Sequence, residues 1–237
     1  MMKEPVVWEF ALPKVTLEEV FQAEGADYSK RQPRPGIVEL HRQIMAEAEN
    51  LVSPAAVWCE AAVKGVGQEE VILENGQKLT SRLLAQTAGT AEKLILFTVT
   101  IGSAMDNRTA EYSEAGKIME AFIIDAVGTA YIVKSAMAAL AKIEEKYHSN
   151  DLQTTFPMGP GHSYWRKMED MRTIFEILRP ERVGLRLTES NLIMPRKSVA
   201  MVFGAGSKLP DFRGKSHCDF CDLQNDCKMR TGSGPIC

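Results

Sequence analysis

The stretch Leu94–Ile101 (LILFTVTI), together with the helix-forming run that follows Gly102, decides the fold class. Most of its residues are β-branched or aromatic and Gly102 ends the run, which predicts a buried strand. The residues from Met105 to His148 predict a long helical region that is interrupted near Gly116. The second half of this region is apolar almost all round, so we expect it to lie at the centre of the packing.

Shorter elements are predicted on both sides of this strand and helix. Thr16-Leu17-Glu18-Glu19 has the T-x-x-E form of a capping box, which predicts the start of a short helix. Hairpins and helices alternate without a regular βαβ rhythm, and this favours an α+β fold over a doubly wound sheet. The remaining predicted elements are strands at 6–10, 55–63, 71–73, 183–187 and 198–203, and helices at 37–51 and 166–178.

Composition and charge exclude several classes of function. The 237 residues are 45% hydrophobic and 25% charged, with 28 Lys and Arg against 31 Asp and Glu, which is typical of a globular protein. Lys and Arg are scattered, so we expect no nucleic-acid partner. The most apolar run, Ala121–Ala141, contains Asp125 and Lys134. Each would cost roughly 2.5–3.5 kcal/mol near a bilayer centre, so we expect no membrane span. The N-terminus lacks a signal-peptide pattern, and we expect a cytoplasmic protein.

Asp125 stands out because it lies inside the most apolar predicted helix. A carboxylate in such surroundings must be paired or hydrogen-bonded, so we interpret it as structural, with contact to a ligand as the alternative. Lys134 lies on roughly the opposite face of the helix and is not expected to be its partner. No P-loop, G-x-G-x-x-G, G-x-S-x-G or H-E-x-x-H motif is present, so the sequence describes no self-contained catalytic centre.

Four of the five cysteines lie close together at the end of the chain, at Cys218, Cys221, Cys227 and Cys237. In a chain with no export signal, thiols are more often metal-bound or free than paired in disulfides. This spacing suits a tetrahedral Zn²⁺ ion or an iron–sulfur cluster, and it does not choose between them. Free thiols and a redox-active C-x-x-C pair are the alternatives. We expect Cys237 as the fourth ligand, with His217 or Cys59 as possible substitutes.

A second candidate site is the loop Gly159-Pro160-Gly161-His162. Glycine and proline prevent regular structure here, and glycine lets the backbone approach a ligand closely. The loop either connects two helices or presents backbone N–H and C=O groups to a ligand. Glu189 and Ser190 either end a strand or face the same cleft.

Three further segments follow one another in a recognisable order: Gly159–Trp165 (GPGHSYW), Val183–Ser190 (VGLRLTES) and Met194-Pro195-x-x-Ser198-Val199. With them the chain resembles the activation domain of vitamin B12-dependent methionine synthase. Thr98–Gly102 and Ile124–Gly128 further resemble the stand-alone, single-domain members. The resemblance implies a curved antiparallel sheet with packed helices at 55–206. Residues 1–54 form an N-terminal segment with helices, and 207–237 form a cysteine-rich tail outside the shared part.

The resemblance also implies a function. In that family the domain binds S-adenosylmethionine and docks on a cobalamin domain, where inactive cob(II)alamin is reduced and remethylated. We therefore expect an accessory component that docks on a corrinoid-binding protein or cobalamin-dependent methyltransferase. The cobalamin would be bound by that partner. An iron–sulfur cluster in the tail would relay electrons. The alternative is a non-enzymatic binding module or chaperone with a structural zinc, so the enzyme assignment stays open.

The family's ligand loop falls on Pro157–His162, and three positions depart from the family pattern. Pro157 stands where the family has an arginine that holds the adenosylmethionine carboxylate, and His162 and Phe203 stand where it has tyrosines. Losing a guanidinium removes a strong charge-assisted contact, so we expect weak or absent adenosylmethionine binding. We expect the faces Gly159–Trp165 and Leu187–Ser190 to dock on the corrinoid protein, with Tyr164 and Trp165 as rigid aromatic contacts. The alternative for Trp165 is that it is the first buried residue of the following helix.

Overall fold

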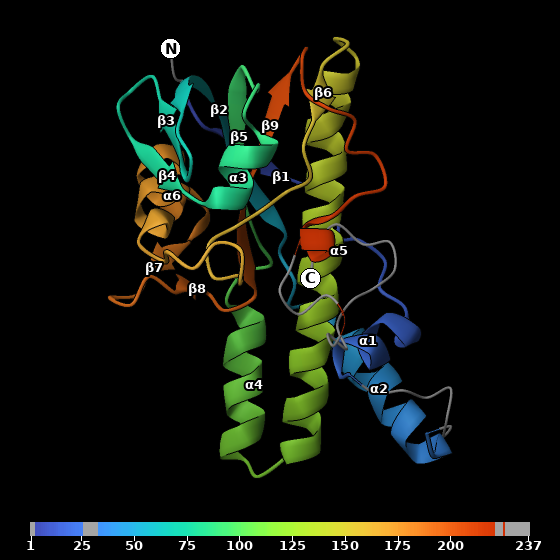
Figure 1. The fold of residues 1–237 in the computed structure, drawn as a ribbon. Helices are drawn as coiled ribbons and strands as arrows, with labels where there is room; N and C mark the ends of the chain where they lie inside the picture. The colour runs from blue at the N-terminus through green and yellow to red at the C-terminus, as the bar shows by residue number, and fades with distance from the viewer. Residues whose placement is uncertain (1–2, 26–32, 221–224, 226–237) are drawn as a thin grey trace.

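The fold is built on one antiparallel sheet, seen in a computed structural model that describes residues 3–25, 33–220 and 225 (Figure 1). Its seven strands follow the order β4-β3-β2-β5-β9-β6, and β1 pairs with β2. A separate two-stranded hairpin consists of β7 and β8. The strands are β1 Val6–Glu9, β2 Ala55–Val66, β3 Glu70–Leu73, β4 Lys78–Thr80, β5 Lys93–Thr100, β6 Gln153–Thr154, β7 Arg186–Leu187, β8 Ile193–Met194 and β9 Ser198–Gly206.

The strand predicted at 94–101 is confirmed as β5, which lies between β2 and β9. Alternate residues of β5 point into two different hydrophobic clusters, because successive side chains of a strand face opposite sides of the sheet. Ile95 and Phe97 belong to the cluster under α5, whereas Leu94 and Leu96 belong to the cluster with α3 and α6. Because both faces of β5 are buried, its residues are apolar throughout instead of alternating between apolar and polar. The helices are α1 Leu17–Ala23, α2 Pro35–Ala48, α3 Arg82–Thr87, α4 Ala104–Glu114, α5 Ile118–His148 and α6 Asp170–Leu178.

The long helical region is a hairpin of α4 and α5, which extends beyond the sheet in Figure 1. The predicted interruption is confirmed, because Gly116 adopts φ +72° between the two helices. The most apolar window of α5 is long enough to cross a membrane, but 67% of it is buried inside the protein. Helices α1 and α2 pack on the same helix, and the predicted capping box at Thr16 and Glu19 opens α1.

Asp125 on α5 forms ion pairs with the segment that precedes β9. Its carboxylate lies 2.9 Å from Lys197 Nζ and 3.6 Å from Arg196 Nη2. Lys134 pairs with Glu19 at 2.5 Å, so it is not the partner of Asp125, as predicted. The Asp125 side chain is 34% exposed, so it is only half-buried, and its role is to tie α5 to β9.

Two predicted elements differ from those observed. The helix predicted at 166–178 begins only at Asp170, because turns occupy the residues before it. The strand predicted at 183–187 is a 3₁₀ turn, Pro180–Val183, followed by the short β7. Strand β9 runs on past Phe203 to Gly206, where a side chain would be crowded: a Cβ on Gly206 would lie 3.0 Å from the backbone nitrogen of Glu92.

A buried carboxylate on β2 makes the stability of the fold pH-dependent. Glu60 is 6% exposed, and its two oxygens accept from Lys3, Lys146 and Lys93 at 2.9, 3.0 and 3.4 Å. Burial raises the pKa of Glu60, but the hydrogen bonds from Lys3 and Lys146 and the charge of Lys93 outweigh it and lower the pKa to about 2. A lowered pKa stabilises the folded state above pH 4.5, and this contribution is lost as the pH falls towards 2.

We expect Glu60→Gln to lower the free energy of unfolding at pH 7 by about 2 kcal/mol, allowing for partly exposed lysines. The difference from wild type should shrink as the pH falls from 4.5 to 2, because wild-type Glu60 then becomes protonated as well. Urea titrations at several pH values measure this. Glu70→Gln is the matched control, because Glu70 pairs with Lys78 at an exposed site and should change stability by about 0.5 kcal/mol or less. A difference that is constant with pH would contradict the prediction.

Candidate functional site

The loop that carries the family resemblance is held on β9 by its backbone. Met158 N donates to Val202 O at 2.9 Å, and Val202 N donates to Met158 O at 2.7 Å. The next residue, Gly159, passes so close to β9 that a Cβ there would lie 2.5 Å from the carbonyl oxygen of Ala200. Gly161 adopts φ +99°, and its N–H donates to Trp165 O at 2.9 Å. The turn therefore requires glycine at both positions, Gly159 because it leaves no room for a Cβ and Gly161 because of its positive φ.

Trp165 anchors this turn in the core, and its predicted role in docking is wrong. It is 1% exposed, and its Nε1 donates to Asp170 Oδ2 at 2.9 Å. The same oxygen accepts from Thr80 N at 2.6 Å, so the pair joins the loop, α6 and β4. Tyr164, in contrast, is half-buried and stacks on His162, with ring centroids 5.1 Å apart and planes 4° from parallel.

The first part of the cysteine-rich tail folds back onto this loop. Phe156, at the start of the loop, packs against Phe212 and Phe220, with centroids 5.6 and 5.3 Å away. The short 3₁₀ turn η2, His217–Phe220, brings the His217 ring to 5.4 Å from His162 and 5.5 Å from Tyr164. This contact joins two candidate sites that are separate in the sequence. No local sequence signal predicts it, because it depends on the path of the chain after β9.

Burial sets the charge of the two neighbouring imidazoles. Burial lowers the pKa of His162, and the charge of a protonated His217 lowers it further. Burial also lowers the pKa of His217, against smaller opposing effects of the Pro157 carbonyl and Asp219. Both rings are therefore neutral at pH 7, and each has one nitrogen lone pair that can bind a proton donor or a metal ion.

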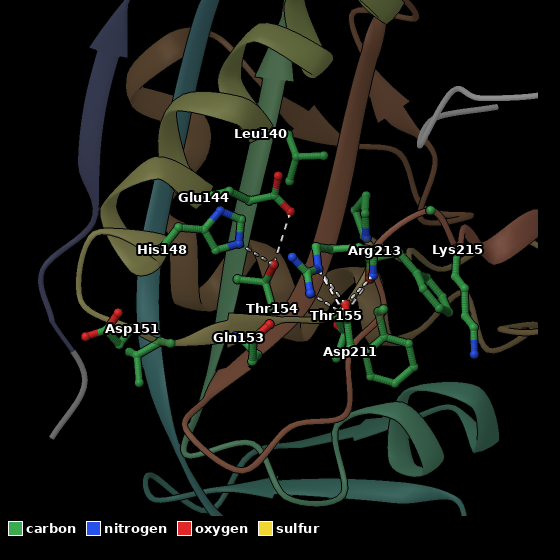
Figure 2. Close-up of a pocket in the computed structure, with 15 residues that line it drawn as sticks. Leu140, Glu144, His148, Asp151, Gln153, Thr154, Thr155, Asp211, Arg213 and Lys215 are labelled. Carbon is green, nitrogen blue, oxygen red and sulfur yellow. Dashed lines mark hydrogen bonds and ion pairs between the residues drawn. The ribbon is translucent and has the colours of Figure 1, made fainter.

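A cavity of about 520 Å³ opens where the loop begins, between the end of α5, β6 and the tail (Figure 2). Its polar lining includes Glu144, whose oxygen accepts from Thr154 Oγ1 at 3.4 Å. Burial raises the pKa of Glu144 to about 6, although the Thr154 hydrogen bond opposes this. The lining residues are Leu140, Glu144, His148, 151–157 and 211–215.

Among the described residues that line this cavity, Arg213 of the tail supplies the one guanidinium. Arg213 binds both oxygens of Asp211, at 2.6 to 3.0 Å. Hydrogen bonds from Arg213 lower the pKa of Asp211 to about 2, so the pair is ionised at neutral pH. Pro157 also lines the cavity, but its side chain cannot bind a carboxylate. The guanidinium of Arg213 is therefore paired with the carboxylate of its own neighbour, at an exposed site.

The other predicted site residues lie elsewhere. Glu189 and Ser190 are exposed at the turn of the β7–β8 hairpin and are not among the described residues that line the cavity. Arg172 Nη2 on α6 donates to the Glu189 carbonyl at 3.1 Å, and the Ser190 hydroxyl lies 3.0 Å from that of Thr188. Glu189 and Ser190 therefore lie in a tight turn after the end of β7, which agrees with their interpretation as residues that end a strand.

The predicted metal ligands are only partly within the described residues. Cys218 is 8% exposed in η2, whereas Cys221, Cys227 and Cys237 lie outside the described part of the chain. Within 3–25, 33–220 and 225, no three His, Cys, Asp or Glu side chains form a group that could hold a metal ion. Cys59 is buried in the sheet, and burial followed by the Glu60 charge raises its pKa to about 12, which makes it a poor substitute ligand.

Comparison with known proteins relates the fold to that of a solved domain. No protein-family model and no curated protein matches the chain. The crystal structure of the MetH reactivation domain bound to AdoHcy matches with a TM-score of 0.60 and 16% sequence identity, over 88% of this chain and 80% of that one. The predicted fold class is confirmed: the chain is an α+β protein with the curled antiparallel sheet and packed helices of the MetH reactivation domain.

Proposed function

We propose that this chain is an accessory component that docks on a corrinoid-binding protein and supports the return of its cobalt to the active state. The observation that carries this proposal is the likeness to the MetH reactivation domain over 88% of the chain. The turn at 158–165 supports the proposal, because this segment, which resembles the family most closely, is held rigidly on β9. The partner would be a corrinoid protein or a cobalamin-dependent methyltransferase.

The docking face in this proposal is the exposed part of the turn. His162 and Tyr164 are half-buried and stack in parallel beside the exposed Gly161, so the parts of the two rings that His217 leaves uncovered would form this face. Rigid aromatic groups lose little conformational entropy on binding and often carry most of the binding energy of an interface. The β7–β8 hairpin with Glu189 and Ser190 would form the second part of this face.

We expect His162→Ala and Tyr164→Ala to weaken docking by about 2 kcal/mol or more, roughly 30-fold in the dissociation constant. Cross-linking and binding titration with corrinoid proteins from the same source measure this. Phe122→Ala is the matched control, because Phe122 is 53% exposed on the distant α4–α5 hairpin. Equal binding by all variants would place the docking face elsewhere. If no corrinoid protein binds, the proposed function fails.

The second part of the proposal is a metal centre in the tail, formed by Cys218, Cys221 and Cys227. Reduction of Co(II) to Co(I) takes one electron, and a methyl donor then transfers its methyl group to Co(I). A reduced iron–sulfur cluster would supply that electron, whereas Zn²⁺ has no redox chemistry. Anaerobically purified protein that is brown, with broad charge-transfer absorption, supports reductive reactivation. A colourless protein with one zinc supports the alternative, a binding module with a structural metal.

Adenosylmethionine binding is expected to be weaker than micromolar in calorimetry. Among the described residues that line the cavity near Pro157, the one guanidinium belongs to Arg213, which is paired with Asp211. Losing one charged hydrogen bond costs about 1.5–3 kcal/mol, or roughly tenfold to hundredfold in affinity. Pro157→Arg should therefore raise the affinity by that factor. A micromolar or tighter constant for the wild type would contradict the prediction and support full analogy with the MetH domain.

A further inference from the structure

We propose that the groove between strand β1 and the C-terminal end of α5 binds an extended acidic segment of a partner protein, which joins the sheet as a further strand beside β1. None of the described residues that line this groove lines the cavity next to Pro157 or belongs to the turn at 158–165. The proposal therefore concerns a second surface and does not depend on docking to a corrinoid protein.

Strand β1 is an edge of the sheet to which a further strand can pair. Its residues Val6–Glu9 pair with residues 55–58 of β2 on one side. On the other side, no backbone hydrogen bond joins β1 to another described segment. Every second residue of an antiparallel strand directs its N–H and C=O groups away from the paired neighbour. These outward groups can bind an extended peptide by strand addition.

A groove of about 390 Å³ lies directly beside this edge. Val6 and Val7 are 48% and 41% exposed, so the edge strand offers apolar side chains as well as backbone groups. In strand addition, alternate side chains of the bound segment enter such a groove and determine which sequences bind. The residues that line the groove are Val6, Val7, Trp8 and Trp58 from the sheet and Lys142, Ile143 and Lys146 from α5.

The charges of the groove favour an acidic segment. Lys142 and Lys146 are the two charged residues among the described residues that line it. Lys146 Nζ lies 3.0 Å from Glu60, a carboxylate that two further lysines also bind. Lys142 Nζ lies 3.9 Å from the centroid of the Trp8 ring and forms no ion pair with a described residue. A carboxylate of the bound segment would therefore meet an ammonium group next to the apolar side chains.

The same features disfavour two other occupants. A second copy of this chain, paired through β1, would bring together two grooves of the same positive charge, which costs binding energy. A small anionic amphiphile would fill the groove but leave the outward N–H and C=O groups of β1 unused. An extended acidic segment uses the backbone edge, the apolar side chains and the ammonium group together.

The test is the binding of a short, end-blocked, fluorescein-labelled peptide in which leucine and glutamate alternate with serine, followed by fluorescence anisotropy. A second peptide has lysine in place of glutamate. A third has methylated backbone nitrogens, so it keeps the side chains but cannot pair as a strand. We expect the first peptide to bind saturably, and the other two to bind about tenfold more weakly or worse.

We expect Lys142→Glu to weaken binding of the acidic peptide about five- to tenfold and to strengthen binding of the lysine peptide, because it reverses the charge at an exposed position. Lys117→Glu is the matched control. Lys117 also lies over an aromatic ring, that of Tyr112, but it stands at the opposite end of α5 and should leave the binding of both peptides unchanged. Val6→Ser should weaken both, because it removes apolar area from the groove.

Several outcomes would overturn the proposal. Equal binding of the acidic and lysine peptides, or no effect of Lys142→Glu, would show that charge does not select the occupant. A methylated peptide that binds as tightly as the first would exclude strand addition. If dodecanoate binds in the groove and no peptide does, the groove is a site for a small anionic amphiphile. If sedimentation velocity shows a dimer that Val6→Ser dissociates, the edge belongs to a second copy of the chain.

Discussion

Replacing Gly159 with alanine is expected to lower the free energy of unfolding by about 1–3 kcal/mol and to abolish docking on the corrinoid partner. The new Cβ would lie 2.5 Å from the Ala200 carbonyl oxygen, a backbone atom of β9 that cannot turn aside. The loop must then move off the strand. This breaks the paired hydrogen bonds between Met158 and Val202 and displaces the His162–Tyr164 stack.

Gly65→Ala on β2 is the matched control for this prediction. A Cβ at Gly65 would meet no atom within 4 Å, so the substitution should leave docking unchanged and stability equal or slightly higher. Urea denaturation and the binding titration with the corrinoid protein measure the two effects. A Gly159→Ala protein with the wild-type denaturation midpoint would show that the loop does not pass so close to β9.

Cys218→Ser/Cys221→Ser protein is expected to lose its bound metal completely. Removing two of four ligands leaves too few donors for a tetrahedral centre, and hydroxyl groups are poor ligands for zinc or iron–sulfur clusters. The core should stay folded, because the two hydrophobic clusters are built from residues that precede the cysteines. Metal analysis and the thermal unfolding of the core are the measurements.

Cys59→Ala is the control, because it removes a thiol that lies outside the tail. Cys59 is 1% exposed, lies within the sheet and has a pKa raised to about 12 by burial and by Glu60, so it should remain a protonated core residue. Its substitution should leave the metal content unchanged. The metal assignment is wrong if the double variant retains as much metal as the wild type.

Part of the site could be predicted from the sequence, and part could not. The loop at 159–162 was identified from its glycines and prolines, and the structure shows the close approach and positive φ that require them. The sequence leaves two interpretations open for Trp165, because an aromatic residue next to a turn can point into the core or out to a partner. Only its contact with Asp170, five residues along, shows which of the two it does.

The elements with a strong local sequence pattern could be predicted from the sequence alone. These are the buried strand at 94–101, the capping box at Thr16 and the helix break near Gly116. Each depends on side-chain chemistry within one strand or one or two helical turns, which a sequence displays directly. The short helix α3 and the late start of α6 were missed, because packing against distant strands overrides weak local preference.

Tertiary structure decided which of these elements meet. The order of the strands, the burial of Trp165 and the return of η2 to the 156–162 loop all join residues far apart in the chain. His217 contacts the Pro157 carbonyl across 60 positions, and no periodicity encodes such a pair. Whole hydrophobic faces must be buried together, so these contacts depend on the fold as a unit. The sequence therefore revealed two separate candidate sites, whereas the fold brings the start of the tail against the loop.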